Sequence, residues 1–536
     1  MTLALRPPCD EGVIHGRPSR GSCPKRAAPW VLAATIIGSG MTFIDGTVVN
    51  VALPALQASL GATMAEVQWV VESYALLLSA LILVGGALGD RFGRRRVFAA
   101  GVVLFGAASL ACGVSRGSAQ LIAARGLQGV GAALLVPGSL AIISAEFDEG
   151  ERGRAIGTWS AATAILAALG PVVGGWLIES FSWRGIFFLN LPLCVAVLAI
   201  LMRFVRETRD DEAPPRLDWT GTLLAAGGLG ALVFAFIEAP QRGFAEPRVW
   251  GAALAGTACL AAFAVAESVQ RHPMVPPRLF RSRAFTGANL LTLLLYGALS
   301  GALFFVPFHL IQIHGYGATA AGAALLPFIV IIFLLSRWAG GLADRHGARG
   351  PLIVGPALAG VGFALLALLG ASGDYWTAYF PGLTVLGLGM AISVAPLTTT
   401  VMNAVETRLA GTASGVNNAV ARTAGVLAVA VFGVLVFGRF RSELAERAAR
   451  VSAAPETRAF VVDAGVRLAA AAVPPGLAPS EARALRDAVG ESFTAGFRLA
   501  MLVAAGLALA GAATSAVLIA ARAGAPTGRG RVAAGD

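Results

Sequence analysis

The chain has 536 residues, of which 56% are hydrophobic and 13% are charged, and its mean hydropathy is +0.74. A soluble domain carries about 25% charged residues, so the composition excludes a string of water-soluble domains. The formal net charge of +11 suits either a nucleic-acid partner or a membrane protein with its positive charge on one side. The charge distribution favours the membrane protein, and we expect no nucleic-acid partner. The five cysteines indicate no disulfide framework, since none lies in a segment expected outside the cell.

Residues 1–29 are polar, basic and rich in Pro and Gly, which predicts a disordered tail. Apolar stretches then recur with short breaks, and each predicts a helix, because a backbone inside the bilayer must satisfy its own hydrogen bonds. The expected spans are 30–53, 68–88, 97–114, 119–143, 155–178, 185–202, 218–239, 249–268, 284–310, 318–337, 351–371, 376–400, 412–437 and 497–521. The sequence therefore predicts an all-α integral membrane protein with fourteen transmembrane helices.

Arginine and lysine predict the orientation of these spans. With fourteen spans, both termini lie on one side, together with the even-numbered breaks. That side holds 26 arginines and lysines, including the tail 522–536, whereas the short breaks on the other side hold four. Positive residues stay in the cytoplasm, so we expect a multi-pass protein of the cell membrane with both termini cytoplasmic.

The break at 438–496 is long and carries eight arginines and seven acidic residues. Long translocated loops largely escape the charge rule, so we expect this loop outside the cell. Two interpretations of this loop remain open: a partly ordered external domain that covers the bundle, and an unstructured insertion. Within the loop, Ser480 is expected to be the N-cap of a short helix.

A short motif occurs twice at a constant offset of 254 residues, each time at a cytoplasmic break. Its copies are Gly86, Leu88, Asp90, Arg91, Gly93 and Arg95, and Gly340, Leu342, Asp344, Arg345, Gly347 and Arg349. Internal repeats of this kind are typical of secondary transporters. We expect two six-helix bundles at 30–202 and 284–521, with residues 218–268 as an inserted helical hairpin.

Five segments carry a resemblance to a known family. They are Gly86-Ala-Leu-Gly-Asp90-Arg91-Phe-Gly93-Arg94-Arg95-Arg96, Ile44-Asp45-Gly46-Thr47-Val48-Val49-Asn50, Arg125-Gly-Leu-Gln128-Gly129-Val-Gly131, Gly170-Pro171-Val-Val-Gly174-Gly175 and Trp183-Arg184-Gly-Ile-Phe-Phe-Leu-Asn190-Leu-Pro192. In this order the chain resembles the fourteen-span drug:proton antiporters of the major facilitator superfamily. The resemblance implies the major facilitator fold and proton-driven export by alternating access.

The repeated loop has two interpretations. Asp90 lies where the second span enters the cytoplasm, so its carboxylate can pair with Arg91 or Arg94, or cap a neighbouring helix. A latch of Gly86, Asp90, Arg91, Gly93 and Arg94, with Asp344 and Arg345 in the second copy, could form in one rocking state and break in the other. Topology anchoring by positive residues is the alternative.

The fifth span contains Gly170, Pro171, Gly174 and Gly175. Proline favours a kink, and glycines four residues apart allow close approach of a neighbouring backbone. Ordinary tight packing is the alternative. The family resemblance implies that this helix seals the substrate cavity against leakage.

Charged residues inside the spans are the main functional candidates, because each costs roughly 2.5–3.5 kcal/mol to insert. They are Asp45, Glu72, Arg125 and Arg422. Asp45 and Glu72 are expected at similar depth, where burial and mutual repulsion would let them load and release protons. A static pair with Arg125 or Arg422 is the alternative. Glu72 departs from the family pattern, which puts a small or hydroxyl residue there, and could tune substrate charge instead.

The sequence contains no nucleotide-binding or catalytic motif. The chain has one lysine, Lys25, which follows a proline and cannot form a Walker A loop. No metal or cofactor is expected. His309, at the outer end of the ninth span, is an interfacial histidine or part of a proton path.

We therefore expect a monomeric, proton-coupled exporter of small amphipathic molecules, such as cationic drugs. A proton-coupled carrier of one defined metabolite and a non-transporting sensor are the alternatives.

Overall fold

The computed structural model describes residues 27–209, 218–270, 273–370, 374–406, 409–451, 455–471, 473 and 477–519. The described residues contain helices and no strand. Fourteen helical segments among them are long and apolar enough to cross a membrane, which confirms the expected number of spans. The tails at 1–26 and 520–536 lie outside the described residues.

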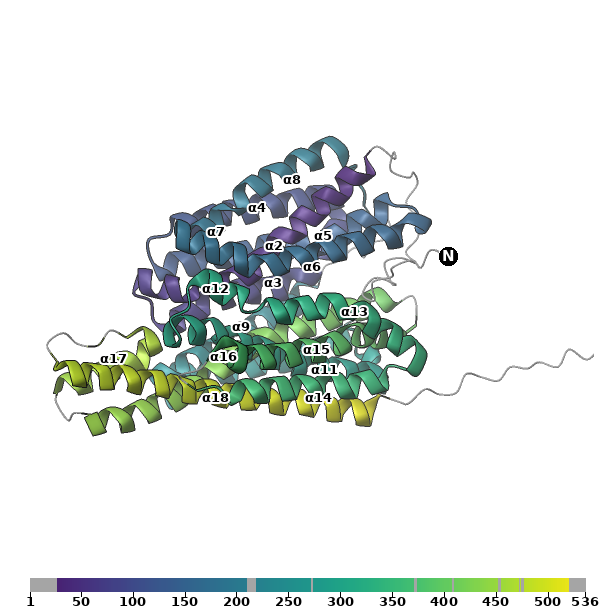
Figure 1. Ribbon diagram of the computed structural model, residues 1–536. Helices are drawn as coiled ribbons and strands as arrows, with labels where there is room; N and C mark the ends of the chain where they lie inside the picture. The colour runs from purple at the N-terminus through teal and green to yellow at the C-terminus, as the bar shows by residue number, and fades with distance from the viewer. Residues whose placement is uncertain are drawn as a thin grey trace, which may run out of the picture.

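The first bundle lies in the upper part of Figure 1. Its helices are α2 (Ala28–Leu60), α3 (Met64–Phe92), α4 (Arg94–Val114), α5 (Ser118–Glu146), α6 (Glu149–Ser180), and the short α7 (Gly185–Phe188) that leads into α8 (Asn190–Phe204). One core joins α2, α3, α4, α5 and α8, with Met41, Tyr74, Phe105 and Ala132 from four of them, and α6 packs against α2 and α5 through Ile156 and Trp159. Six membrane-crossing segments therefore pack as one unit.

Two inserted helices follow, α9 (Trp219–Arg242) and α10 (Pro247–Val269). The turn between them uses Gly243, whose φ of 85° lies in the region that favours glycine. Leu229 and Val233 of α9 pack in one cluster with Ala65 of α3 and Val426 of α16 (Ala410–Val451). The inserted pair therefore contacts both bundles.

The second bundle lies in the lower part of Figure 1. Its remaining elements are the 3₁₀ turn η1 (Pro277–Arg281), α11 (Arg283–Phe308), the π-helical turn η2 (His309–Ile313), α12 (Ala318–Ala323), α13 (Leu326–His346), α14 (Arg349–Ala367), α15 (Tyr375–Asn403), α17 (Pro455–Arg467), the 3₁₀ turn η4 (Leu468–Ala470) and α18 (Pro479–Leu518). The tenth span is thus made of α12 and α13 with a short break between them.

The segment 438–496 is mostly helical over its described part. Helix α16 continues to Val451, α17 follows, and the last span already begins at Pro479. The N-cap of α18 is Ala478, so the expectation that Ser480 caps a separate short helix is wrong. Figure 1 places α17 at the end of the molecule opposite the N-terminus, as the odd number of spans, thirteen, that precede it requires.

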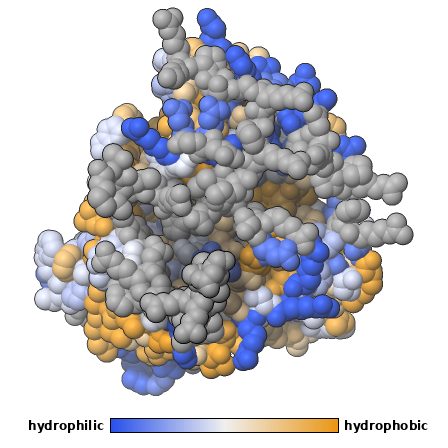
Figure 2. Space-filling model, turned by 90° about the vertical axis from the view of Figure 1, so that its right-hand side faces the viewer, coloured by the Kyte–Doolittle hydropathy of each residue, from blue (hydrophilic) through white to orange (hydrophobic). Residues whose placement is uncertain are grey.

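The end that carries the N-terminus is hydrophilic. Figure 2 shows blue, polar side chains at this end and orange, apolar surface on the flanks beside it. A bilayer places apolar groups on the flanks and polar groups at the two ends, because it is apolar only in its middle.

Candidate functional site: a buried charge network in the first bundle

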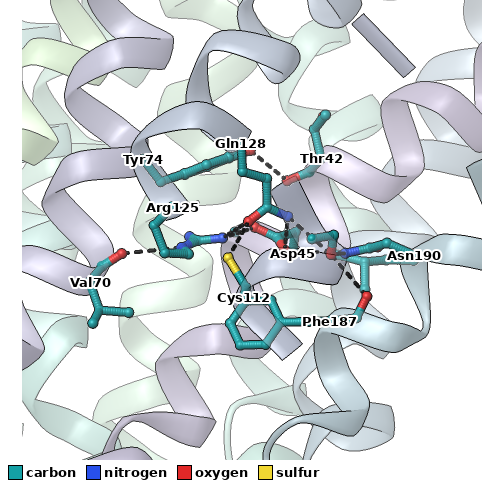
Figure 3. Close-up of polar contacts among 12 residues, drawn as sticks. Thr42, Asp45, Val70, Tyr74, Cys112, Arg125, Gln128, Phe187 and Asn190 are labelled. Carbon is teal, nitrogen blue, oxygen red and sulfur yellow. Dashed lines mark hydrogen bonds and ion pairs between the residues drawn. The ribbon is translucent and has the colours of Figure 1, made fainter. Parts of the chain in front are cut away.

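Asp45 lies in the middle of α2 with 1% of its surface exposed. Its Oδ2 accepts a hydrogen bond from Nη1 of Arg125 on α5 at 2.5 Å. Its Oδ1 accepts from Nε2 of Gln128 at 2.8 Å and from Nδ2 of Asn190 at 3.3 Å. Three of the segments that carry the family resemblance therefore converge on one carboxylate (Figure 3).

Arg125 is also 1% exposed, and its guanidinium has several partners. Nε donates to the carbonyl of Val70 at 3.1 Å, and Nη1 donates to Oε1 of Gln128 at 2.7 Å. The guanidinium carbon lies 4.3 Å from the centre of the Tyr74 ring, a favourable cation–π distance. Asp45 and Arg125 thus form a neutral pair in which both carboxylate oxygens and the Nε and Nη1 atoms are hydrogen-bonded.

Glycines in the α5 segment from Arg125 to Gly131 allow the helices that carry these side chains to approach closely. A Cβ on Gly129 would meet the backbone of Tyr74, and one on Gly131 would lie 2.7 Å from the backbone nitrogen of Phe105. Only glycine therefore allows α5 to lie this close to α3 and α4. Ser109 of α4 completes the network by accepting from Asn190 at 3.0 Å and donating to the carbonyl of Phe187 at 2.8 Å.

Asp45 is paired in this conformation. A pair with Arg125 was the stated alternative, and the structure contains it. Gln128 and Asn190 are partners that the sequence reasoning did not assign. The signal for Gln128 was its spacing of three residues from Arg125, which puts both side chains on one face of the helix.

Glu72 is also 1% exposed, but it has no such partners. Its Oε2 is buried without a hydrogen bond within the described part of the chain. Gln68 and Leu83, which contact α16, lie within about 60° of Glu72 around α3; Gln68 donates to the carbonyl of Val429, and the Leu83 side chain lies beside Gly415. Glu72 therefore faces α16 and is too deeply buried to contact a substrate in this conformation.

Asp45 and Glu72 do not form the mutually repelling pair that the sequence suggested. Tyr74, which contacts Arg125, is two residues from Glu72 and thus on roughly the opposite side of α3. The hydrogen bonds of Asp45 go to Arg125, Gln128 and Asn190 and none goes to Glu72. The two acids have separate surroundings.

The loop between α3 and α4 differs in part from its expected arrangement. Asp90 accepts from Nε of Arg94 at 2.9 Å, which confirms pairing of the acid with a loop arginine. The start of α4 is capped by Glu207, whose carboxylate accepts from the backbone nitrogens of Arg95 and Arg96 at 3.1 and 3.2 Å. Sequence reasoning considered Asp90 for a capping role and missed Glu207, which lies more than a hundred residues away.

Three further latch residues are also placed. The turn residue Gly93 has φ 111°, Gly86 lies against Pro137 of α5, and the Arg91 guanidinium lies over the Phe92 ring at 5.2 Å. The side chains of Asp344 and Arg345 lie outside the described residues.

The glycines of the fifth span serve two contacts. Added Cβ atoms on Gly170 and Gly174 would collide with Thr47 and Val48 of α2. A Cβ on Gly175 would lie 2.5 Å from the carbonyl oxygen of Ala318, at the start of α12 in the other bundle. The expected close approach is therefore confirmed, and α6 remains one helix through Pro171.

The two bundles are joined at the end opposite the N-terminus. Gln312 of η2 donates to Oε1 of Gln57 on α2 at 3.0 Å. Glu179 of α6 accepts from the backbone nitrogen of Thr319 at 3.1 Å and from its hydroxyl.

His309 is fully buried within the second bundle. Its Nδ1 is bonded to the Tyr379 hydroxyl, and its Nε2 lies 3.2 Å from the Thr494 hydroxyl oxygen. Its ring stacks on Phe497 at 4.3 Å. His309 is therefore a hydrogen-bonded core residue in this conformation rather than an interfacial one.

The fold and the buried network define a multi-pass membrane transporter. The family profile of the Major Facilitator Superfamily matches residues 35–429, and the chain belongs to this family. It is accordingly a transporter and not an enzyme.

Several curated relatives are named for resistance or export. The chain is 34% identical over 511 residues to the tetracenomycin C resistance and export protein of Streptomyces glaucescens, covering 94% of this chain and 93% of the relative. It is 35% identical to the multidrug resistance protein Stp of Mycobacterium tuberculosis, over 88% of each chain. It is 36% identical to a puromycin resistance protein of Streptomyces alboniger, over 83% of this chain and 88% of the relative.

Solved structures share the fold. A bacterial homologue of the human lysosomal transporter Spinster, in an inward-facing and occupied conformation, aligns with a TM-score of 0.64 at 17% identity, over 92% of this chain and 98% of that structure.

Proposed function

We propose that this protein exports small amphipathic molecules, antibiotics among them, in exchange for protons. The observation that carries the proposal is the buried Asp45–Arg125 pair, because ionisable groups inside a membrane are costly and mark ion pathways. The names of the relatives, which include a multidrug resistance protein and an antibiotic export protein, favour export over import.

The network suits a proton exchange at Asp45. In the unprotonated state the carboxylate holds Arg125, Gln128 and Asn190 around it. A proton that binds Oδ2 removes the negative charge and weakens the ion pair, and Arg125 then keeps its bonds to the Val70 carbonyl and the Gln128 side chain. Loss of the proton restores the pair. Glu72, buried without a partner, is the second candidate proton carrier.

Alternating access requires the bundles to part at one end and close at the other. In this conformation Gln57–Gln312 and Glu179–Thr319 close the end opposite the N-terminus. With both termini in the cytoplasm, as the 26-to-4 distribution of positive residues predicts, the closed end is the outer one. Of the antiporter-type glycines, Gly175 lies at the α6–α12 contact that closes with this end, and Gly170 and Gly174 hold α6 against α2 within the first bundle.

We also propose that the Asp90 loop is the latch that holds the other conformation. Asp90 is 37% exposed and is bonded to Arg94 of its own bundle, so it is accessible to a partner from the second bundle, such as the repeat that contains Asp344 and Arg345. Asp90→Asn should lower transport without lowering the amount of folded protein. Loss of folded protein would instead indicate a structural role.

Inverted membrane vesicles with an imposed pH gradient test the main proposal. Wild-type vesicles should accumulate ethidium, puromycin or an anionic dye when the interior is acidic, and Asp45→Asn should abolish that uptake because asparagine has almost the same shape but carries no proton. Asp463→Asn, the same change in a half-exposed acid of α17, is the matched control and should transport normally. Full proton-driven uptake by Asp45→Asn would overturn the assignment.

A further inference from the structure

Arg422 is a second arginine inside a membrane-spanning helix. It lies on α16, within the span Thr412–Val451. Unlike Arg125 it is not fully buried, since part of its side chain is accessible. The guanidinium is always charged, so in the middle of a span it requires a partner or a polar space beside it.

Its position on α16 follows from two contacts. Gly415 lies beside Leu83 of α3, and the carbonyl of Val429 accepts from Gln68 of α3. Arg422 is seven residues from each, which places all three positions on one side of the helix. Arg422 therefore lies on the side of α16 that faces the first bundle, at the level of the middle of α3.

No charge within the described part of the chain compensates Arg422. Its guanidinium has no ion pair or hydrogen bond there, and Tyr74 is the titratable group with which it interacts electrostatically. Glu72 of α3 also faces α16, but it makes no ion pair or hydrogen bond with Arg422. Asp45 is already neutralised by Arg125. Arg422 is therefore a partly accessible positive charge beside α3 with no acidic partner among the described residues.

We propose that Arg422 binds the acidic group of the transported molecule, which makes amphipathic anions, apolar molecules with one carboxylate, sulfonate or phenolate, the favoured substrate class. The inference rests on the proposed export function. A guanidinium binds a carboxylate or sulfonate through two parallel hydrogen bonds and a phenolate oxygen through a charge-assisted one, and the surrounding membrane interior strengthens the attraction. The apolar part of the substrate would lie among the aromatic and aliphatic side chains between the bundles.

A pair of probes tests this inference. 8-Anilinonaphthalene-1-sulfonate and N-phenyl-1-naphthylamine differ only in the sulfonate, and their binding to the full-length protein in nanodiscs is compared after subtraction of binding to empty nanodiscs. The wild type should bind the anion at least ten-fold more tightly than the neutral probe. Arg422→Gln should remove this preference while leaving neutral binding within two-fold, and Arg422→Lys should keep part of it.

Arg498→Gln is the matched control. It removes an arginine whose Nε already donates to the Leu369 carbonyl, and it should keep the wild-type preference. Equal wild-type binding of both probes, or equal weakening of both by Arg422→Gln, overturns the inference. An ion pair between Arg422 and Glu72 would also overturn the inference. It would appear as a strongly destabilised Arg422→Gln protein whose stability is recovered by the further change Glu72→Gln. If neither probe raises the unfolding temperature of the wild type, anion recognition is likewise rejected.

Transport separates this inference from the proposed function. Proton-driven uptake of the neutral probe with no preference for the anion would leave the exporter standing and reject the role of Arg422. A ten-fold preference for the anion, with no uptake under a pH gradient, would support the site and reject proton-coupled export.

Discussion

Oδ2 of Asp45 lies 2.5 Å from Nη1 of Arg125, although the two residues are 80 positions apart and belong to α2 and α5. Burial of both charges is tolerated because each retains further hydrogen bonds, from Gln128 and Asn190 to the acid and from the guanidinium to Val70. Such pairs contribute little net stability, but removal of one partner leaves a buried, uncompensated charge.

This asymmetry predicts the behaviour of single and double variants. Arg125→Gln should lower the free energy of unfolding by about 3–5 kcal/mol, because Asp45 is left unpaired. The double variant Arg125→Gln with Asp45→Asn should recover most of that loss. Denaturant unfolding of the purified proteins measures both, and strictly additive effects would mean that the two side chains are not coupled.

Glu72→Gln should leave the unfolding temperature within the error of the wild type, since glutamine has nearly the same shape and the Glu72 carboxyl has no partner to lose. It should also reduce proton-driven uptake less than Asp45→Asn does. Vesicle transport at equal expression tests this order. An equal or larger loss in Glu72→Gln would make Glu72 the principal proton carrier.

Gly175→Ala should open the contact between α6 and α12, because the added Cβ would lie 2.5 Å from the Ala318 carbonyl oxygen. Cross-linking of cysteines introduced at 57 and 312, in a background without native cysteines, should fall several-fold. Gly251→Ala is the control, since Gly251 of α10 has no atom within 4 Å of an added Cβ. Unchanged cross-linking in Gly175→Ala would show that this contact does not hold the bundles together.

The orientation in the membrane can be checked by labelling with an impermeant maleimide. Ala459→Cys, on an exposed position of α17, should react in intact cells. Arg209→Cys, between α8 and α9, should react only after permeabilisation. The reverse pattern would place the termini outside.

Much of the fold was predictable because hydropathy and positive charge are local signals. Every expected span has a helical counterpart, including Trp219–Arg242 and Pro247–Val269. The C-terminal end of α16 and the N-terminal start of α18 were not predictable from hydropathy. Both helices extend beyond their apolar spans, to Val451 and Pro479, through charged and less apolar residues. Hydropathy identifies only the part of a helix that is apolar.

The candidate site was predictable as residue types but not as contacts. Asp45 and Arg125 are conspicuous because charges are rare in spans, yet their pairing depends on the close approach of α2 and α5. Glu207 and Asn190 gave no local signal, since their partners lie far away in the sequence. The separation of Glu72 from Asp45 followed from the angle around α3, which depth alone does not determine.

The contact of α9 with both α3 and α16 makes the two flanks of the transporter mechanically unequal. On this flank Leu229 and Val233 of α9 pack against both bundles. Helix α10 supports α9 through the close approach of Gly228 and Gly256. Any rotation of one bundle against the other must disrupt the apolar contacts of α9 with α3 and α16. Elsewhere the two bundles meet where α6 packs against α12, through Gly175 and Gly322. We therefore expect the inserted pair to restrict movement of the bundles on its own flank, so that any opening is wider on the side away from it.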